Sequence, residues 1–388
     1  MADVVGPADP GAVASEATAG APRPPLRSVV LAGGGTAGHV NPLLAVADEL
    51  RRRHAGIDVT VLGTAEGLEA ELVPARGYRL VTVPRVPLPR RPTLDWFRLP
   101  ARLRRAVAVA RDAAVGAQAV VGFGGYVATP AYLAARGRVP VVIHEQNARP
   151  GLANRLGARW ADAVAVTFPG TRLPGATVTG LPLRPPVAAL AAARQTDADG
   201  ARRAAAKTLG LDPAATTLLV TGGSLGALSL NRALAGAAAD LADAGVQVLH
   251  LTGTGKDAEV RAAVAGVPGY HVLAYLADMQ DALAVADLVV CRAGAGTVSE
   301  LAALGIPAVY VPLPVGNGEQ RLNAAPVVDA GGGVLVPDAQ LDPAWVRAHV
   351  VPLLADRARL AAMAQAARSV GTTDAAARVA DLVEQVAR

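Results

Sequence analysis

The chain has 388 residues, more than one hydrophobic core usually supports, so we expect two domains. Apolar residues make up 52% of the chain and charged residues 18%, a composition that excludes a disordered or fibrous protein. The net charge is +5, and nearly all of the basic residues are arginine. Together with the abundant alanine and glycine, this indicates the base composition of the genome rather than nucleic-acid binding. The single cysteine, Cys291, excludes an internal disulfide and a multi-thiolate metal site.

The sequence shows neither a membrane span nor a signal peptide. It has no run of about 18 uncharged apolar residues, which a transmembrane helix would need. Residues 1–26 are rich in Ala, Pro and Gly and carry Asp3, Asp9 and Glu16, without the basic start and apolar centre of a signal peptide. We therefore expect a disordered tail on a cytosolic protein.

From residue 28, short apolar runs alternate with helical patterns, which is typical of β-α-β units and parallel sheets. The glycine-rich segment Gly33–His39 follows the first run, and a helix is then expected with Asn41 as N-cap and Pro42 at its first position. The expected strands are Ser28–Ala32, Asp58–Leu62, Arg79–Val83, Ala119–Val121 and Val139–Ile143.

The same pattern starts again near residue 216. Segment Gly222–Ala227 leads into an expected helix over about Ser229–Ala242, and the expected strands are Thr216–Thr221, Val246–Leu251, His271–Leu273, Leu288–Val290 and Ala308–Val311. We expect two similar open-sheet domains, residues 27–184 and 185–370, with the boundary between Gly180 and Lys207. Ligands of such sheets bind beyond the carboxyl ends of the strands, so the cleft between the domains is the expected site.

Gly33–Gly38 matches the dinucleotide-binding pattern G-x-G-x-x-G between a strand and a helix, where free N–H groups attract a phosphate or another anion. A dinucleotide site also needs an acid at the end of the second strand. Asp58 lies at the start of that strand, and Gly63-Thr64-Ala65 fills the place of the acid. A nicotinamide-cofactor-binding protein is therefore only an alternative.

Gly222-Gly223-Ser224-Leu225-Gly226 fits the nucleophile elbow G-x-S-x-G of hydrolases. A serine hydrolase using Ser224 would also need an acid followed by a histidine, for which His250, His271 and His349 are available. His250 ends one expected strand and His271 begins another, so neither is expected on a loop above the sheet. Two glycines and a serine beside a helix N-terminus hold a phosphate equally well, and we favour that interpretation.

Two further segments carry polar side chains. His144-Glu145-Gln146-Asn147 follows a buried strand and is expected in the cleft, but Ala148 replaces the second histidine of a zinc motif. In Gly294–Glu300, Thr297 and Glu300 form the capping-box pattern T-x-x-E. The glycines before it would also admit a ligand, whose vicinal hydroxyls a carboxylate can bind, and composition leaves both interpretations open.

Residues 79–111 hold nine arginines and one acid, Asp95. Trp96 and Phe97 lie in the middle, which is typical of an interfacial anchor to anionic lipid. A solvated helix face, with Leu103 and Val107 as core contacts, accounts for part of the stretch, and no nucleic-acid recognition motif accompanies it. The expected membrane contacts are Arg90, Arg91, Trp96, Phe97, Arg98 and Arg102.

Taken in order, these motifs resemble the MurG family of bacterial peptidoglycan N-acetylglucosaminyltransferases over residues 27–388. The resemblance rests on Gly34–His39, Gly122–Val127, His144–Asn147, Gly180–Arg184, Gly222–Ala227 and Cys291–Glu300, followed by Gln320 and Asn323. It implies the two-domain α/β fold called GT-B and β1→4 transfer, with inversion, from UDP-N-acetylglucosamine to undecaprenyl-diphosphate-linked N-acetylmuramoyl-pentapeptide (lipid I). It also implies a last helix, about Thr372–Ala387, that crosses back to the first domain.

The resemblance further implies the roles of individual residues. Ser224 and the loop Ala295, Gly296, Thr297, Val298, Ser299 and Glu300 would bind the diphosphate, with Glu300 on the ribose. Arg184 and the backbone of Leu276 would lie beside the uracil. The residues near the transferred sugar or the acceptor would be Asn147, Gln320, Thr36, Ala37 and Gly38. The family often has other residues at Leu181, Leu225 and Glu319.

Inversion needs one base, and His39 is the leading candidate because imidazole has a pKa of about 6.5. Binding of the acceptor diphosphate by His39 is the alternative. No metal or cofactor is expected, since helix N-termini can stabilise the departing UDP. The expected partners are the two substrates, an anionic membrane surface at the cytoplasmic face and other proteins of wall synthesis, but no nucleic acid.

Overall fold

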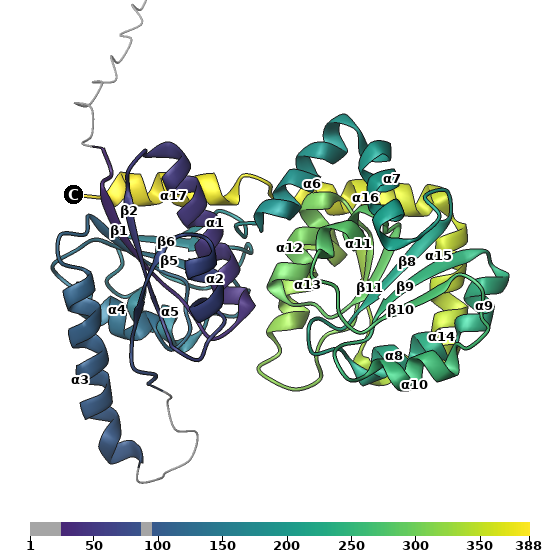
Figure 1. The fold of residues 1–388 in the computed structure, drawn as a ribbon, viewed down its shortest axis with the longest axis horizontal. Coiled ribbons are helices and arrows are strands. Elements are labelled where there is room, and N and C mark those ends of the chain that lie inside the picture. Colours follow the sequence, from purple (N-terminus) through teal and green to yellow (C-terminus); the bar gives the residue numbers. More distant parts are fainter. Residues whose placement is uncertain (1–24, 87–94) are drawn as a thin grey trace, which may run out of the picture.

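The computed structural model describes residues 25–86 and 95–388 (Figure 1). For residues 95–98 it describes the backbone alone. Two separate parallel sheets, each covered by helices, form two domains that lie side by side. Of the expected tail, residues 1–24 lie outside the described part of the chain. Within the described ranges, no helix combines the length and the apolarity that crossing a bilayer requires.

The first domain contains a seven-stranded sheet in the order β3-β2-β1-β4-β5-β6-β7. Its strands are β1 Ser28–Ala32, β2 Asp58–Gly63, β3 Arg79–Thr82, β4 Ala119–Gly122, β5 Val141–Glu145, β6 Ala163–Val166 and β7 Ala176–Val178. Its helices are α1 Ala37–Arg53, α2 Glu69–Ala75, α3 Asp95–Ala113, α4 Ala128–Ala135 and α5 Leu152–Gly157. The strand order reverses beside β1, so the loop after β1 opens a crevice.

The second domain repeats this plan around a six-stranded sheet in the order β10-β9-β8-β11-β12-β13. Its strands are β8 Thr216–Thr221, β9 Val246–Leu251, β10 Tyr270–Leu273, β11 Leu288–Cys291, β12 Ala308–Tyr310 and β13 Gly333–Leu335. Its helices begin with α6 Pro185–Thr196, α7 Ala198–Leu209, α8 Leu228–Ala235, α9 Ala238–Asp243, α10 Asp257–Ala263, α11 Met279–Val285, α12 Ala295–Leu304 and α13 Glu319–Asp329. They continue with η1 Asp338–Gln340, α14 Pro343–Trp345, η2 Val346–Val350, α15 Val351–Ala355 and α16 Arg357–Val370.

Most of the strands in the structure overlap a strand predicted from the sequence, and three do not. The predictions of Ser28–Ala32, Thr216–Thr221 and Val246–Leu251 are confirmed at both ends. The prediction missed β6, β7 and β13; β7 is exposed at all three of its residues and so lacks the apolar run that marks a buried strand. The helix expected over 229–242 is two helices, α8 and α9, and a Cβ at Gly236 between them would lie 2.6 Å from Pro343 Cγ.

The prediction of Asn41 as an N-cap is wrong. Helix α1 begins earlier, at Ala37, with Thr36 as the N-cap, so Pro42 lies inside the helix. Proline has no N–H to donate, which leaves the carbonyl of Gly38 without its helical donor. Gly38 is exposed at the edge of a cleft, where water can hydrate that carbonyl.

The chain passes between the domains twice. The first crossing leads from β7 to α6, and Val187 of α6 already belongs to the core of the second domain. The second leads from α16 to α17 (Ala375–Val386), which packs against α1 (Figure 1). Buried Val379 and Val383 of α17 lie in the core of the first domain. The crossings touch, because a Cβ at Gly180 would lie 2.6 Å from the Cβ of Thr372.

Candidate functional site

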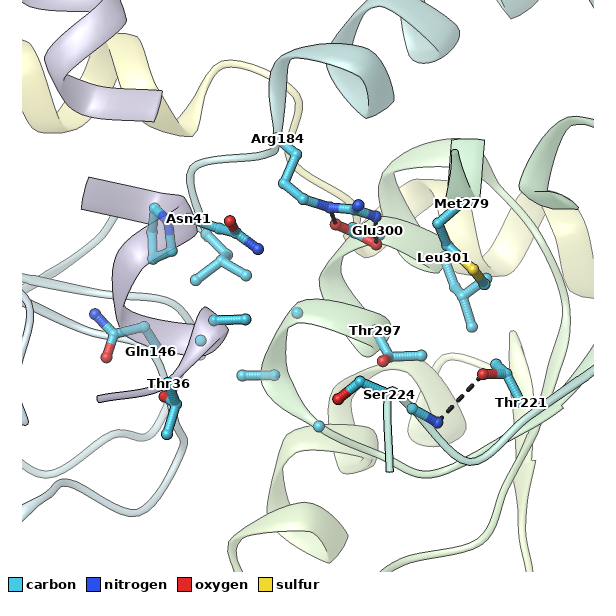
Figure 2. A pocket seen from close by; sticks show the side chains of 18 of the residues that line it. Thr36, Asn41, Gln146, Arg184, Thr221, Ser224, Met279, Thr297, Glu300 and Leu301 are labelled. Carbon is cyan, nitrogen blue, oxygen red and sulfur yellow. Dashed lines mark hydrogen bonds and ion pairs between the residues drawn. The ribbon is translucent and has the colours of Figure 1, made fainter. Parts of the chain in front are cut away.

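A cleft of about 630 Å³ lies between the domains and is lined by residues of both (Figure 2). The turns after β1 and β8 border it, as do the segments after β5 and β11, so it lies at the carboxyl ends of both sheets. Thirteen of the fifteen catalytic and substrate-binding residues expected from the sequence line this cleft. They are Thr36, Ala37, Gly38, His39, Asn147, Arg184, Ser224, Leu276, Ala295, Gly296, Thr297, Glu300 and Gln320.

Ser224 lies on the turn between β8 and α8 and lines the cleft beside Thr297 (Figure 2). The N–H of Gly223 donates to the hydroxyl of Thr221 over 3.2 Å, which shapes the turn. Gly226 has φ +64°, and a Cβ there would lie 1.9 Å from the carbonyl oxygen of Thr252. Glycine is therefore required at that position for the turn to approach the loop after β9.

Helix α12 points its N-terminus into the cleft. Its N-cap, Gly294, provides no side-chain cap, and the N–H of Val298 is the first to bond back, to the carbonyl of Gly294 over 3.0 Å. The N–H groups of residues 295–297 therefore have no acceptor within the helix and can bind an anion. Val298 and Ser299 are the two expected site residues whose side chains line a separate cavity of about 240 Å³.

The capping-box interpretation of Thr297 and Glu300 is wrong, because the helix begins before Thr297. Glu300 instead accepts two hydrogen bonds from Arg184, over 2.7 and 2.9 Å (Figure 2). Arg184 comes from the first crossing between the domains, 116 positions earlier, so local sequence could not reveal the pair. The side chains of Met279 and Leu301 lie in the same part of the cleft (Figure 2), and Leu276 is also among the residues that line it.

On the opposite wall, His39 lies in the first turn of α1 and is half-buried. The hydroxyl of Thr36 lies 3.0 Å from its Nδ1, and a Cβ at Gly124 would lie 3.3 Å from its Nε2. Burial lowers the pKa of His39 below its ordinary value of 6.5. The imidazole is therefore neutral at pH 7 and able to accept a proton.

The dinucleotide interpretation of Gly33–Gly38 is not supported by the structure. The N–H of Gly35 donates over 3.0 Å to the carboxylate of Glu69, a residue that the sequence did not single out. The N–H and hydroxyl of Thr64 donate to the same carboxylate over 2.8 and 2.7 Å. An internal anion thus takes up a turn N–H that a dinucleotide phosphate would need.

Of the segment His144–Asn147, only Gln146 and Asn147 line the cleft. The expectation that all four lie there is wrong for His144 and Glu145, which are buried and bond to the backbone. His144 Nε2 lies 3.0 Å from the carbonyl oxygen of Gly180, and burial lowers the pKa of His144 to about 4. Glu145 accepts from the N–H groups of Asn147 and Gly151 over 2.9 and 3.0 Å.

Asn147 also connects the two domains. Its Oδ1 accepts from Asn323 Nδ2 over 3.2 Å, and the N–H of Ala148 donates to Asn323 Oδ1 over 2.9 Å. Gln320, one turn before Asn323 on α13, accepts from the N–H groups of Ala293 and Leu313 over 3.2 and 2.9 Å. The walls of the cleft are thus held at this side by amide hydrogen bonds.

A serine hydrolase is not supported either. The two ring nitrogens of His250 lie within 2.9 and 3.1 Å of the hydroxyl of Tyr270 and the Oδ1 of Asn231, so its imidazole is not directed at Ser224. His349 lies on η2, with its Nδ1 3.0 Å from the carbonyl oxygen of Trp345. None of His250, His271 and His349 lines the cleft.

The expected membrane contacts lie mostly outside the described residues. This holds for Arg90 and Arg91, and for the side chains of Trp96, Phe97 and Arg98. The described part of α3 packs against the first domain through buried Ala106 and Ala110, with Leu103 and Val107 beside them. Arg104, Arg105 and Arg111 are exposed, as a solvated helix face requires.

Two Rossmann-like domains that face each other across a cleft at the carboxyl ends of their strands define the GT-B fold. Residues 29–166 match the glycosyltransferase family 28 N-terminal domain, and residues 217–386 match the glycosyltransferase family 28 C-terminal domain. The chain therefore belongs to glycosyltransferase family 28, and within it to the MurG enzymes.

The chain is 59% identical over 358 residues to a protein of Clavibacter sepedonicus, covering 91% of this chain and 95% of that one. It is 53% identical over 388 residues to a protein of Mycolicibacterium paratuberculosis, covering 98% and 93%. Both are called UDP-N-acetylglucosamine--N-acetylmuramyl-(pentapeptide) pyrophosphoryl-undecaprenol N-acetylglucosamine transferase. The crystal structure of Acinetobacter baumannii MurG is similar with a TM-score of 0.74 and 30% identity, covering 92% of this chain and 99% of that one.

Proposed function

We propose that the chain transfers N-acetylglucosamine from UDP-N-acetylglucosamine to the C4 hydroxyl of the N-acetylmuramoyl group of lipid I, which forms lipid II in peptidoglycan synthesis. The observation that carries the proposal is the cleft itself. One wall presents Ser224 and the open N-terminus of α12, and the other presents a neutral, half-buried His39.

The second domain would bind the donor. The hydroxyl of Ser224 and the N–H groups of residues 295–297 offer donors for a diphosphate, and the dipole of α12 favours its negative charge. The carboxylate of Glu300 already accepts from Arg184, yet each of its oxygens keeps lone-pair capacity for a ribose hydroxyl. Leu276 and Met279 would flank the uracil. Asn147 and Gln320 would lie near the sugar.

The first domain would bind the acceptor and supply the base. The acceptor hydroxyl attacks the anomeric carbon of N-acetylglucosamine, the bond from that carbon to the diphosphate oxygen breaks, and UDP leaves with the electron pair. One displacement inverts the configuration at the anomeric carbon. His39 would take the proton of the attacking hydroxyl, while Thr36 bonds its Nδ1. The free N–H groups of α12 would stabilise the charge on the leaving diphosphate.

The site of action would be the cytoplasmic face of the membrane, where a polyprenyl acceptor stays in the bilayer. The arginine-rich stretch 79–111, with Trp96 and Phe97, would hold the enzyme there as a peripheral protein. Other proteins of wall synthesis are further candidate partners.

The proposal is tested by incubating the protein with UDP-N-acetylglucosamine and a short-chain, water-soluble analogue of lipid I. We expect stoichiometric formation of UDP and of a β1→4-linked disaccharide product, resolved by mass spectrometry and NMR. Thermal shifts with UDP, UDP-sugars, NAD and NADP supply the comparison. Stabilisation by NAD or NADP alone, without sugar transfer, would refute the proposal.

A further inference from the structure

Glu69 is a fully buried carboxylate that plays no part in the chemistry described above. It is the first residue of α2, and none of its surface is exposed to solvent. Burial raises the pKa of its carboxyl, but the hydrogen bonds from Thr64 and Gly35 outweigh this and hold the pKa below its ordinary value. Glu69 is therefore a buried negative charge at neutral pH, a costly feature that hydrogen bonds must compensate.

The surrounding loops are built around this carboxylate. A Cβ at Gly34 would lie 2.4 Å from its Oε1, and one at Gly67 would lie 2.2 Å from its Oε2. A Cβ at Gly63 would lie 2.5 Å from the Cγ of Glu69. Contacts under about 3 Å are not tolerated by carbon atoms, so these three glycines, two in loops and one at the end of β2, make room for one side chain.

The carboxylate holds the turn that presents His39. Glu69 bonds the N–H of Gly35, the next residue is Thr36, and the hydroxyl of Thr36 lies 3.0 Å from His39 Nδ1. Residues 35–38 are exposed, so this stretch of the turn is not packed into the core. The carboxylate is thus connected to the imidazole through Gly35 and Thr36, although Glu69 itself does not line the cleft.

The corresponding point of the second domain carries the opposite charge. There the loop after β9 brings Lys256 onto the turn after β8, and its ammonium donates to the carbonyl oxygen of Leu225 over 2.6 Å. The first turn is thus held through an N–H by an anion, and the second through a carbonyl by a cation. The positive charge of Lys256 therefore favours a negatively charged diphosphate at the second turn.

We propose that Glu69 is a positioning residue for the acceptor side of the reaction, which holds the turn Gly33–Thr36 so that Thr36 and His39 face the acceptor hydroxyl. This inference rests on the proposed function. It holds whether His39 removes the proton or only binds the acceptor, because in both roles the imidazole must be placed.

Two variants disturb this contact in different ways. Glu69→Gln replaces one acceptor oxygen by an NH₂ group, which cannot accept from Gly35 or Thr64. Gly67→Ala keeps the charge but places a methyl group within 2.4 Å of the carboxylate, at a position whose φ is not left-handed. Asp162→Asn is the matched control, since Asp162 also accepts a backbone N–H, that of Val141 over 2.9 Å, at the opposite end of the same sheet.

Donor and acceptor are varied separately with UDP-N-acetylglucosamine and the soluble lipid I analogue, and UDP affinity is measured by calorimetry. We expect kcat/KM for the acceptor to fall about 100-fold in Glu69→Gln and in Gly67→Ala, because misplacement by about 1 Å costs that much. The Kd for UDP should stay within about twofold of the parent value, since its site is in the other domain. Asp162→Asn should leave both quantities unchanged.

A parent protein that transfers no sugar would refute the proposed function. With an active parent, unchanged kcat/KM for the acceptor in the folded variants would overturn the role of Glu69. An equal loss of UDP affinity and acceptor kcat/KM in both variants would also overturn it, since that result indicates general loosening. If Glu69→Gln does not fold, Gly67→Ala decides alone.

Discussion

His39 joins two properties that suit a base in this cleft. It lies at the exposed start of a helix, where it can meet a substrate, and burial lowers its pKa so that it is unprotonated at pH 7. The hydroxyl of Thr36 bonds its Nδ1 and thereby fixes the orientation of the ring.

For His39→Ala we expect turnover to fall by about 10²–10⁴ because the base is lost. UDP affinity should be nearly intact, since UDP would bind to the other wall. In the parent, kcat should fall on the acid side only below pH 6.5, because the pKa of His39 is lowered from that value and the protonated ring cannot accept a proton. A variant that keeps a tenth or more of the parent turnover at saturating acceptor would remove His39 from the role of base, as judged by initial rates.

Glu300 and Arg184 form a half-buried ion pair with two hydrogen bonds. Such a pair neutralises both charges in the empty cleft, and the carboxylate is held ready for a ligand that donates hydroxyl groups. Its position on α12, behind the open helix N-terminus, places it next to the expected diphosphate site.

For Glu300→Ala we expect the KM for UDP-N-acetylglucosamine to rise more than the stability falls. Loss of a charge-assisted hydrogen bond costs about 1.5–3 kcal/mol, equivalent to a rise in KM of roughly 10- to 150-fold. Steady-state kinetics and thermal unfolding measure the two effects. Glu259→Ala is the control, because Glu259 pairs with Arg232 on an exposed face. A lower Tm with unchanged affinity for UDP would assign Glu300 a purely structural role.

The two glycine turns are alike in sequence and differ in how their loops are held. Both connect an inner strand of a parallel sheet to a helix, and both lie where the strand order reverses. In the second domain the loops after β8 and β9 are in close backbone contact at Gly226 and Gly253. A Cβ at Gly253 would lie 2.6 Å from the Cα of Gly226. Lys256 bonds across this junction to the carbonyl of Leu225, beside Ser224.

For Lys256→Met we expect the KM for UDP-N-acetylglucosamine to rise about 5- to 30-fold, with little change in the acceptor KM. The charge-assisted bond to the turn is worth about 1–2 kcal/mol, and without it Ser224 is held less firmly. The only other lysine, Lys207, is exposed on α7, and Lys207→Met should behave as the parent. Equal donor kinetics in the two variants would show that the turn needs no such bond.

Protonation of buried histidines links the stability of the whole molecule to pH. Burial lowers the pKa of His144 and of His250 to about 4 from an ordinary value of 6.5. As the pH falls, the unfolded chain binds these protons at a higher pH than the folded protein does. The contribution of the neutral histidines to the free energy of unfolding is therefore complete above pH 6.5 and is lost as the pH falls through about 4. His144 contacts Gly180 at the first crossing, so the loss includes the connection between the domains.

We therefore expect Tm to fall as the pH is lowered from 7 towards 4, measured by calorimetry in buffers of constant ionic strength. His144→Gln should have a lower Tm at pH 7 and a shallower dependence on pH, because one of the titrating groups is gone. His349→Gln, at an exposed position, should keep the parent's profile. A parent Tm that does not change over this range would contradict the linkage.

Membrane attachment would involve the molecule as a whole, since the cleft must face the surface that carries the acceptor. The arginines of stretch 79–111 would each contribute about 1 kcal/mol near an anionic leaflet, an attraction that salt screens. Trp96 and Phe97 would add apolar insertion that salt does not screen.

We expect binding to vesicles to require anionic lipid and to weaken with salt without vanishing. Replacement of Trp96 and Phe97 by serine should abolish the salt-resistant part in a sedimentation assay, because the apolar insertion is lost. Activity on the water-soluble acceptor should stay at the parent level. Equal sedimentation of the parent and the double variant at high salt would place the anchor elsewhere in the chain.

The sequence was sufficient for features that depend on near neighbours in the chain. The alternation of short apolar runs with glycine turns predicted two parallel-sheet domains, and the strands β1, β8 and β9 lie where expected. The turns at the carboxyl ends of these strands predicted a cleft there, and His39, Ser224 and Glu300 do line it. Strand and helix periods are local properties, so a short stretch of sequence carries them.

The tertiary structure alone decided the contacts between residues far apart in the chain. Glu69 reaches Gly35 across 34 positions, and Arg184 reaches Glu300 across 116. In the sequence Glu69 was one of many acids and Glu300 matched a capping box, because a local pattern does not contain the partner that a side chain meets. Those partners depend on how sheets and crossing segments pack, and packing made one carboxylate the support of a turn and the other half of an ion pair.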